Sequence, residues 1–138
     1  MLHVSDKSVL VFRELKVPDL DSLVRLGEHA WWMRTRSREV VEGLLLQDAT
    51  KVYGLFDGGR LVASGALLTD GLTKAVLVDV VVDEAYRRGG CGRLLVEKIM
   101  ETVPDHIEGI LYCRKELEGM YVQHGFRIDD SYSLMLRR

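Results

Sequence analysis

The chain has 138 residues, and its 19 basic and 21 acidic side chains leave a formal net charge of -2. This balance provides no general positive field, so neither nucleic acid nor an anionic membrane is an expected partner. The length suits one domain, spanning 1–138, that can bury a core without help from metals or disulfides. No apolar run approaches the roughly 18 residues of a membrane span, and residues 1–7 lack a signal core, which predicts a cytoplasmic protein.

The two cysteines, Cys91 and Cys113, stand apart, with no CxxC spacing and no histidine beside them. This usage is typical of reduced thiols in a cytosolic protein. Because no base neighbours Cys91, we expect it to be a small apolar residue that faces the core. His3, His106 and Cys113 do not have the spacing of metal ligands, so no metal site is expected.

Residues 9–68 contain the signals of one strand, two amphipathic helices and a hairpin. Pro18-Asp19 suits the first turn of a helix, and Ser37 is a favourable N-cap. Asp57-Gly58-Gly59 supplies the positive φ values that tight hairpin turns require. These signals predict a strand at 9–15, helices at 18–27 and 37–47, and hairpin strands at 51–56 and 60–68.

The segment 28–36 has no clear helical or strand period, yet it holds two tryptophans, a methionine and two arginines. Paired aromatic rings beside arginines would form the wall of a substrate pocket, and loops on rigid scaffolds carry much of recognition. Trp31, Trp32 and Arg34 are therefore candidate substrate-binding residues. The alternative is that the two indoles close the core over a helix junction.

A strand, a glycine loop and a helix follow one another in the middle of the chain. Residues 76–82 are apolar and mostly β-branched, interrupted only by Asp79. The loop contains Gly89, Gly90 and Gly92, after which apolar residues recur at helical spacing. Such a loop presents unpaired N–H groups at the positive end of the helix macrodipole, which predicts a site for an anion.

The remaining residues complete a mixed α/β pattern. Thr69-Asp70-Gly71 makes a turn before the 76–82 strand, and Pro104-Asp105 ends the helix that follows the glycine loop. Three hairpin-linked strands in the middle, with helices before and after them, predict one sheet with helices on both faces. Beyond Pro104-Asp105 we expect a strand at 107–113, a short helix at 115–123 and a terminal pair of strands over 125–136.

The glycine loop differs from two common phosphate-binding motifs. It lacks the Gly-Lys-Ser/Thr of a P-loop, and Gly89, Gly90 and Gly92 do not reproduce G-x-G-x-x-G. Three hairpin-linked strands also come where a dinucleotide-binding fold would open with a parallel βαβ unit. A different anionic ligand is therefore expected.

Residues 82–92, Val-Asp-Glu-Ala-Tyr-Arg-Arg-Gly-Gly-Cys-Gly, resemble the acetyl-coenzyme A loop of the GCN5-related N-acetyltransferases. Arg87, Gly90 and Gly92 match its Arg/Gln-x-x-Gly-x-Gly/Ala core. Residues 120–126 are similar to the family's second motif, in which a tyrosine is followed after three residues by Gly-Phe. The order of elements also agrees over nearly the whole chain.

The resemblance implies a mixed, mostly antiparallel sheet that is splayed between its fourth and fifth strands, with acetyl-coenzyme A in the opening. It implies that the backbone of Val80 and Val82 binds the pantetheine arm and that N–H groups of 88–93 bind the pyrophosphate. Arg88 replaces a frequent glycine, and a positive φ there would cost energy. The implied cofactor-binding residues are Val80, Val81, Val82, Arg87, Arg88, Gly89, Gly90, Cys91, Gly92 and Arg93.

Acetyl transfer to an amine also requires proton movements. An alkylammonium near pKa ~10.4 costs roughly 4.6 kcal/mol to deprotonate at neutral pH. Asp79 is the candidate base, although it could instead fix the end of the strand by accepting loop hydrogen bonds or by pairing with an arginine. Water relayed from Glu28 or His29 is another route.

Tyr121 resembles the family's general acid beside the departing sulfur. Proton transfer from a phenol near pKa ~10 to a thiolate near ~8.5 is uphill by about 2 kcal/mol. We therefore expect Tyr121 to stabilise the thiolate chiefly by hydrogen bonding. The alternative is a tyrosine that serves only core packing.

The sequence thus predicts an N-acetyltransferase that moves the acetyl group of acetyl-coenzyme A directly to a primary amine of a small molecule. A protein or peptide acetyltransferase is one alternative, for which an open acidic groove would be expected. The other is a non-catalytic acetyl-coenzyme A sensor, and Tyr121 argues against it. Members of the family often form dimers, which leaves a homodimer open.

Overall fold

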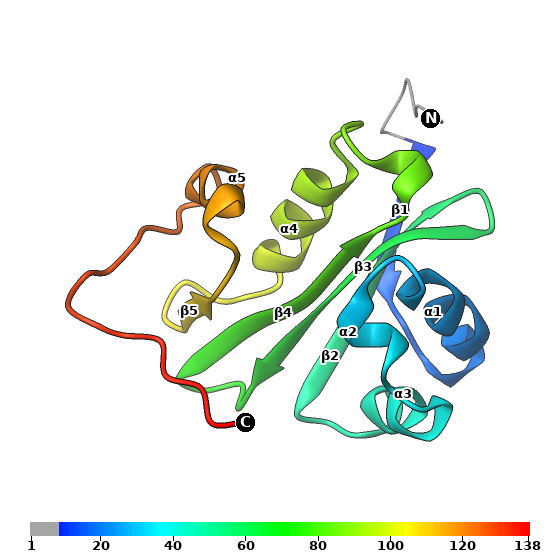
Figure 1. Cartoon of the computed structure of the whole chain (residues 1–138), viewed down its shortest axis with the longest axis horizontal. Coiled ribbons are helices and arrows are strands. Elements are labelled where there is room, and N and C mark those ends of the chain that lie inside the picture. The colour runs from blue at the N-terminus through cyan, green and yellow to red at the C-terminus, as the bar shows by residue number, and fades with distance from the viewer. Residues whose placement is uncertain (1–8) are drawn as a thin grey trace.

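The computed structural model describes residues 9–138, so His3 and the segment 1–7 lie outside the described part. Five strands form one sheet in the order β1-β2-β3-β4-β5 (Figure 1). The first four are antiparallel to their neighbours, and β5 runs parallel to β4. The strands are β1 (Val11–Glu14), β2 (Thr50–Asp57), β3 (Arg60–Thr69), β4 (Lys74–Val82) and β5 (Glu108–Leu111).

Helices cover both faces of this sheet, as predicted. Leu20, Leu23 and Leu26 of α1 belong to one buried cluster, whereas Leu95 and Ile99 of α4 belong to the other. None of the helices in residues 9–138 has the length and apolarity to cross a membrane. The helices are α1 (Leu20–Gly27), α2 (Trp31–Arg34), α3 (Arg38–Leu46), α4 (Cys91–Glu101) and α5 (Glu118–Val122), with 3-10 turns η2 (Val17–Asp19), η3 (Glu84–Tyr86) and η4 (Lys115–Leu117).

The predicted hairpin becomes the centre of the sheet. β2 and β3 pair along almost their whole length, and residues 61–67 of β3 are all buried because helices cover both faces there. β4 contains a bulge, since Ser64 and Ala66 of β3 lie opposite Val81 and Val78. An extra residue in one strand bends it and increases its twist. The bulge includes Asp79, whose φ is 57°.

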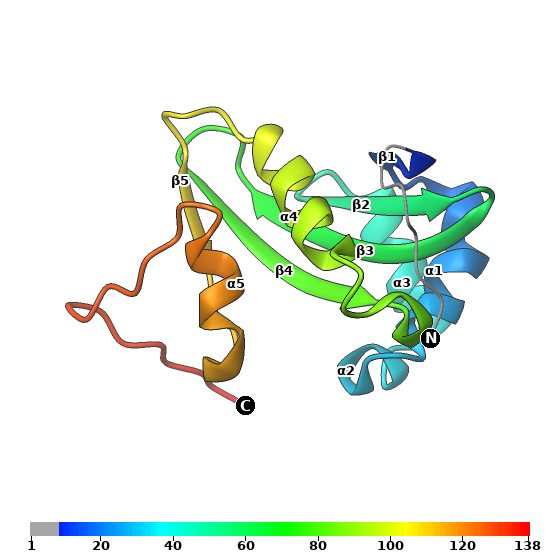
Figure 2. The ribbon, with the colours of Figure 1, turned by 90° about the horizontal axis from the view of Figure 1, so that it is seen from above.

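The sheet opens between β4 and β5, as the family resemblance implies. Their last paired residues are Leu77 and Leu111, whereas β4 continues to Val82. Figure 2 shows the two strands diverging from that point. One edge of β4 beyond Leu77 therefore has no strand beside it in residues 9–138.

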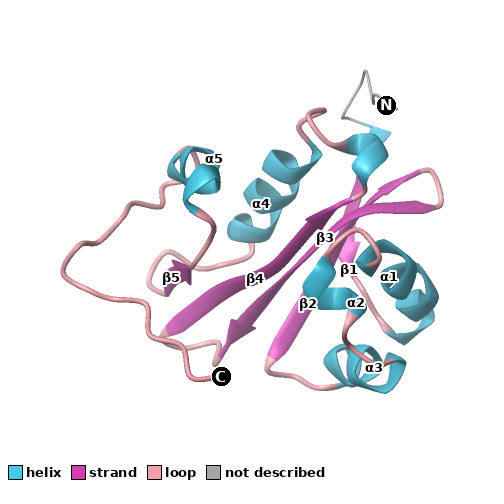
Figure 3. Cartoon of the chain, in the orientation of Figure 1, coloured by secondary structure: helices cyan, strands magenta, loops and turns pink. Residues whose placement is uncertain are grey.

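One helix was not predicted, and one predicted pair of strands was wrong. The segment with the paired tryptophans contains the short helix α2, a single turn in which Ala30 O accepts hydrogen bonds from Met33 and Arg34 N–H. One turn is too short to show a helical period. The predicted terminal strands over 125–136 are absent, and this segment runs as loop (Figure 3).

The terminal segment has a strand-like sequence pattern but forms no strand. Asp129 accepts hydrogen bonds from the N–H and hydroxyl of Ser131, which turns the chain locally. Tyr132 and Met135 are 80% and 87% exposed, so their apolar side chains bury little surface. A short hairpin without a packed face is marginally stable at best in water.

Candidate functional site

A cleft of about 1240 Å³ occupies the opening between β4 and β5. Five parts of the chain form its walls: α2 with the residues on either side of it, the edge of β4, the loop that leads into α4, the segment from the end of β5 through α5, and the end of the terminal segment. This arrangement brings together most of the residues predicted from the sequence. They are Trp31, Trp32, Asp79, Val80, Val81, Val82, Arg87, Arg88, Gly89, Gly90, Gly92, Arg93 and Tyr121.

Two predicted site residues do not line the cleft. The Cys91 side chain is 1% exposed and belongs to the core beneath α4, which agrees with the apolar role expected for it. Arg34 is exposed, and its guanidinium donates a hydrogen bond to Glu28 O at 3.4 Å. The direction of a side chain on a one-turn helix depends on how that helix docks, which sequence spacing does not reveal.

The edge of β4 offers its backbone to the cleft. Val81 and Val82 pair on their other side with Ser64 and Ala63 of β3, which holds the strand in place. A strand with one unpaired edge can accept an extended chain as an additional strand. The arrangement therefore suits an extended ligand that carries amide groups.

The loop before α4 has the backbone of an anion site. Arg88 has a φ of 66°, and the N-cap Gly90 has a φ of 86°. The positive φ at Arg88 costs roughly 1–2 kcal/mol, since this residue has a side chain. The first turn of α4, Cys91 to Arg93, presents N–H groups at the positive end of the helix macrodipole.

The charged lining of the cleft is mainly positive, although the chain as a whole carries -2. Arg36 is one of the two arginines of segment 28–36 that were expected beside the aromatic rings, whereas Arg114 and Arg138 were not predicted as site residues. Arg114 follows the end of β5, so the splayed sheet could have indicated its place, but no spacing signal places Arg138 there. The arginine and carboxylate lining consists of Arg36, Arg87, Arg88, Arg93, Arg114, Arg138, Asp79 and Glu116.

Tyr121 lies on the wall opposite β4 and is 7% exposed. Its ring packs edge-on against Phe126, with the centroids 6.3 Å apart. Burial, with a smaller contribution from the nearby Cys113 thiol, raises the pKa of Tyr121 to about 12. The phenol is therefore neutral throughout the physiological range and can donate a hydrogen bond into the cleft.

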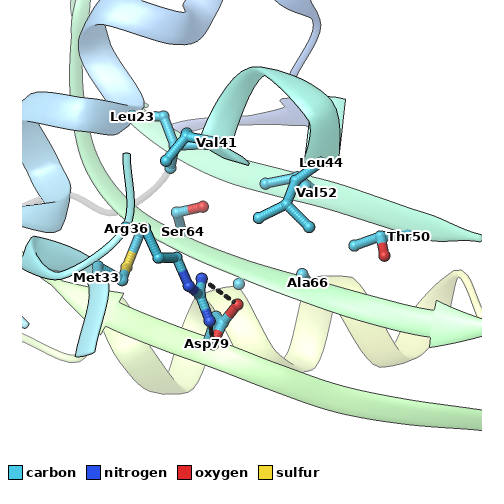
Figure 4. Close-up of a pocket in the computed structure, with 11 residues that line it drawn as sticks. Leu23, Met33, Arg36, Val41, Leu44, Thr50, Val52, Ser64, Ala66 and Asp79 are labelled. Carbon is cyan, nitrogen blue, oxygen red and sulfur yellow. Dashed lines mark hydrogen bonds and ion pairs between the residues drawn. The ribbon is translucent and has the colours of Figure 1, made fainter. Parts of the chain in front are cut away.

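Asp79 and Arg36 form a two-point ion pair across the wall of the cleft. Arg36 Nη1 and Nη2 donate to the two carboxylate oxygens of Asp79 at 2.8 and 3.1 Å (Figure 4). This is the pairing with an arginine that the sequence left open for Asp79. Both side chains also line a small cavity of about 20 Å³ under α3, which has room for one water molecule.

The two tryptophans differ in burial, and together they serve both the wall of the pocket and the packing of the core. Trp31 is 56% exposed, whereas Trp32 is half-buried and packs against the core beneath α1. Their rings meet edge to face, with the centroids 6.0 Å apart. Both line the cleft, so this pair contributes to the core and to the wall of the site.

The contacts of Asp83 and His29 beside the cleft were not predicted from the sequence. The buried Asp83 directly follows β4, and His29 Nε2 lies 3.7 Å from its carboxylate. The His29 carbonyl accepts a hydrogen bond from Arg87 Nη2 at 3.1 Å, which joins the α1–α2 turn to the glycine loop. An aspartate directly after a strand is also a common turn residue, so no separate signal in the sequence marks this role.

The chain matches the family model described as the acetyltransferase (GNAT) family over residues 14–126. No curated protein matches it. An acetyltransferase of Trypanosoma brucei has the same fold, with a TM-score of 0.76, 24% identity, and coverage of 94% of this chain and 99% of that one.

Two further solved structures share the fold at lower identity. Glucosamine-6-phosphate N-acetyltransferase of Arabidopsis thaliana has a TM-score of 0.73 and 18% identity, covering 94% of this chain and 97% of that one. Ribosomal-protein-alanine N-acetyltransferase of Brucella melitensis has a TM-score of 0.74 and 15% identity, and the match covers 94% of this chain and 98% of that one. The chain belongs to the GCN5-related N-acetyltransferase family, and both the family and the fold class predicted from the sequence are confirmed.

Proposed function

We propose that this acetyltransferase moves the acetyl group of acetyl-coenzyme A directly to a primary amine of a small molecule. The observation that carries the proposal is the cleft itself. An unpaired β4 edge, a loop with anion-binding geometry and the buried phenol of Tyr121 all face it. An extended, amide-containing and strongly anionic ligand fits this combination.

The residues divide the binding of acetyl-coenzyme A between them. The backbone of Val80 and Val82 would hold the pantetheine arm, and the N–H groups of 88–93 would hold the pyrophosphate. Each hydrogen bond to a charged acceptor contributes roughly 1.5–3 kcal/mol and requires no particular side chain. The bound thioester supplies the activated acetyl group.

Tyr121 acts on the sulfur that leaves. With its pKa raised to about 12, complete proton transfer to a thiolate near ~8.5 would be uphill by about 5 kcal/mol. A hydrogen bond from the phenol stabilises the developing charge without this cost. We therefore place Tyr121 as a hydrogen-bond donor that yields its proton late in the reaction.

The acceptor side of the cleft supports a small amine. Trp31 and Trp32 bound it on one side, and Leu136 and Arg138 of the terminal segment also line it. A protein or peptide acceptor is the second candidate, and the Brucella relative, whose fold this chain shares, is described as acting on a ribosomal protein alanine. The lining of this cleft is mainly basic, which does not suit a basic peptide.

Isothermal titration with acetyl-coenzyme A, followed by a thiol-release assay over a panel of amines and peptides, tests this function. We expect binding, and thiol release with at least one small amine. Release with peptides alone would favour the second candidate. Binding without release across the panel would favour a sensor.

Asp79 has two candidate roles, a general base and an ion-pair partner of Arg36. Its contact with Arg36 makes it possible to distinguish them by experiment. As a base, Asp79 would have to give up one of its hydrogen bonds from Arg36 to accept a proton. As a partner, it would hold the guanidinium in place on the acceptor side. Because the structure pairs both oxygens, we expect the partner role.

A double-mutant cycle tests this expectation with the best amine of the panel. Asp79→Asn and Arg36→Gln should each raise the acceptor KM by about tenfold, since each removes a charge-assisted contact. The double variant should be no worse than either single variant, because both lose the same interaction. A large fall in kcat for Asp79→Asn, with little change for Arg36→Gln, would identify Asp79 as the base.

A further inference from the structure

The base of the β2–β3 turn contacts the loop that leads into α4. Asp57 and Arg60 face each other as the last pair of the hairpin. The Tyr86 hydroxyl donates a hydrogen bond to Asp57 Oδ2 at 2.7 Å, and Arg60 Nη2 donates to Asp83 Oδ2 at 2.9 Å. Neither Asp57 nor Arg60 lines the cleft, so both hold the loop without facing the ligand site.

Asp83 is a carboxylate that is only 2% exposed at the start of this loop. Burial opposes its ionisation, but a hydrogen bond from Ala85 N–H and the neighbouring Arg60 and His29 outweigh this, so its pKa lies below the usual value. Arg25 Nη1 and His29 Nε2 each lie 3.7 Å from the carboxylate. Side chains from α1, the α1–α2 turn and β3 thus converge on one charged anchor.

The loop beyond this anchor has a backbone that neighbouring contacts must hold. Arg88 and Gly90 both have positive φ, and a left-handed residue with a side chain persists only where its surroundings fix it. Tyr86 is 6% exposed and packs in the core beneath α4. The directions of the N–H groups of 88–93 therefore depend on how residues 83–87 are anchored.

We propose that Asp57 and Arg60 are positioning residues for the pyrophosphate of acetyl-coenzyme A. They fix Tyr86 and Asp83, and thereby hold the N–H groups of the loop in the orientation that the anion requires. This inference rests on the proposed function only for the identity of the ligand, acetyl-coenzyme A. A preorganised loop loses less conformational freedom on binding, so affinity rises without direct contact.

This role predicts an effect confined to one part of the ligand. The β4 edge that would take the pantetheine arm is held by its pairing with β3, independently of the turn at Asp57 and Arg60. Pantetheine lacks the pyrophosphate of coenzyme A. Comparing the affinities for the two ligands therefore distinguishes a change in the position of the loop, which weakens coenzyme A alone, from general damage to the fold, which weakens both.

Titration calorimetry of the full chain with coenzyme A and with pantetheine tests the proposal. The double variant Asp57→Ala/Arg60→Gln should bind coenzyme A about tenfold more weakly and pantetheine unchanged. Asp57→Asn, whose amide oxygen can still accept from the Tyr86 hydroxyl, should lose no more than about threefold. Arg13→Gln, which breaks a two-point ion pair with Asp19 outside the cleft lining, is the control and should change neither affinity.

Equal weakening of both ligands, or unchanged affinity of the double variant for coenzyme A, would overturn the proposal. Hydrogen exchange without ligand is a second readout: the amides of 86–92 should exchange faster in the double variant, and unchanged exchange would contradict the proposed role. Failure of the wild-type chain to bind coenzyme A would refute both proposals. The expected binding pattern without acetyl transfer would refute the proposed function alone and support this inference.

Discussion

Replacing Tyr121 with phenylalanine should lower turnover at least tenfold while leaving the affinity for acetyl-coenzyme A unchanged. The substitution keeps the ring that packs against Phe126 and removes only the hydroxyl of a residue that lines the cleft. Loss of one preorganised donor to a developing charge typically lowers kcat about 10²- to 10³-fold, so tenfold is a conservative bound. Steady-state thiol release gives turnover, and calorimetry gives the affinity.

The matched control for this substitution is Tyr132→Phe, because Tyr132 is 80% exposed. It should change neither turnover nor affinity. If Tyr121→Phe retained full turnover, the phenol would have no part in the mechanism. If it lost affinity and turnover together, the hydroxyl would act in binding.

The raised pKa of Tyr121 also predicts a dependence of stability on pH. The folded value of about 12 exceeds the ordinary value near 10, so the neutral form is favoured in the folded state. Tyr121 thereby contributes roughly 2–3 kcal/mol to the free energy of unfolding. This contribution is fully present below about pH 10 and is lost as the pH rises through 12. Urea unfolding from pH 9 to 11 should show a steeper loss for the wild type than for Tyr121→Phe.

Gly90→Ala should weaken the binding of acetyl-coenzyme A by at least about tenfold. Gly90 is the N-cap of α4 and has a φ of 86°, a conformation that costs a residue with a side chain roughly 1–2 kcal/mol. A loop that relaxes to avoid this strain turns its N–H groups away from the pyrophosphate and loses charge-assisted hydrogen bonds worth roughly 1.5–3 kcal/mol each. Calorimetry with coenzyme A measures the change.

Gly89→Ala provides the matched control one residue earlier. Its φ is not positive, and an added Cβ would meet only Tyr86 O, at an ordinary contact distance of 3.4 Å. We expect it to change the dissociation constant by no more than about threefold. Equal effects of the two substitutions would show that the φ of Gly90 is not what presents the N–H groups.

The elements that the sequence predicted well have local causes. The Asp57-Gly58-Gly59 turn fixes the β2–β3 hairpin, and the strand, glycines and helical run around Gly90 fix the β4–α4 unit. These signals depend on neighbours in sequence, so they are readable without the fold. Tyr121, which was singled out because residues 120–126 resemble a family motif, lines the cleft.

The wrong or incomplete predictions all depended on contacts between distant segments. The terminal strands failed because Tyr132 and Met135 find no face to cover, although their sequence pattern is strand-like. Arg34 does not line the cleft and instead donates to Glu28 O, because the docking of α2, rather than its sequence, decides what that side chain meets. The partner of Asp79 is Arg36, 43 residues away, a distance in sequence across which no spacing rule applies.

By itself, the sequence determined the order of the central elements, because turn chemistry and apolar periodicity act over a few residues, and its two motifs, residues 82–92 and 120–126, indicated the family that the comparison confirms. Only the tertiary structure decided how the site is held. It paired Asp79 with Arg36, left Arg34 out of the cleft lining and brought Arg25, His29 and Arg60 to the Asp83 carboxylate. Ion pairs and burial between distant segments exist only once the sheet has brought those segments together, so no local pattern records them.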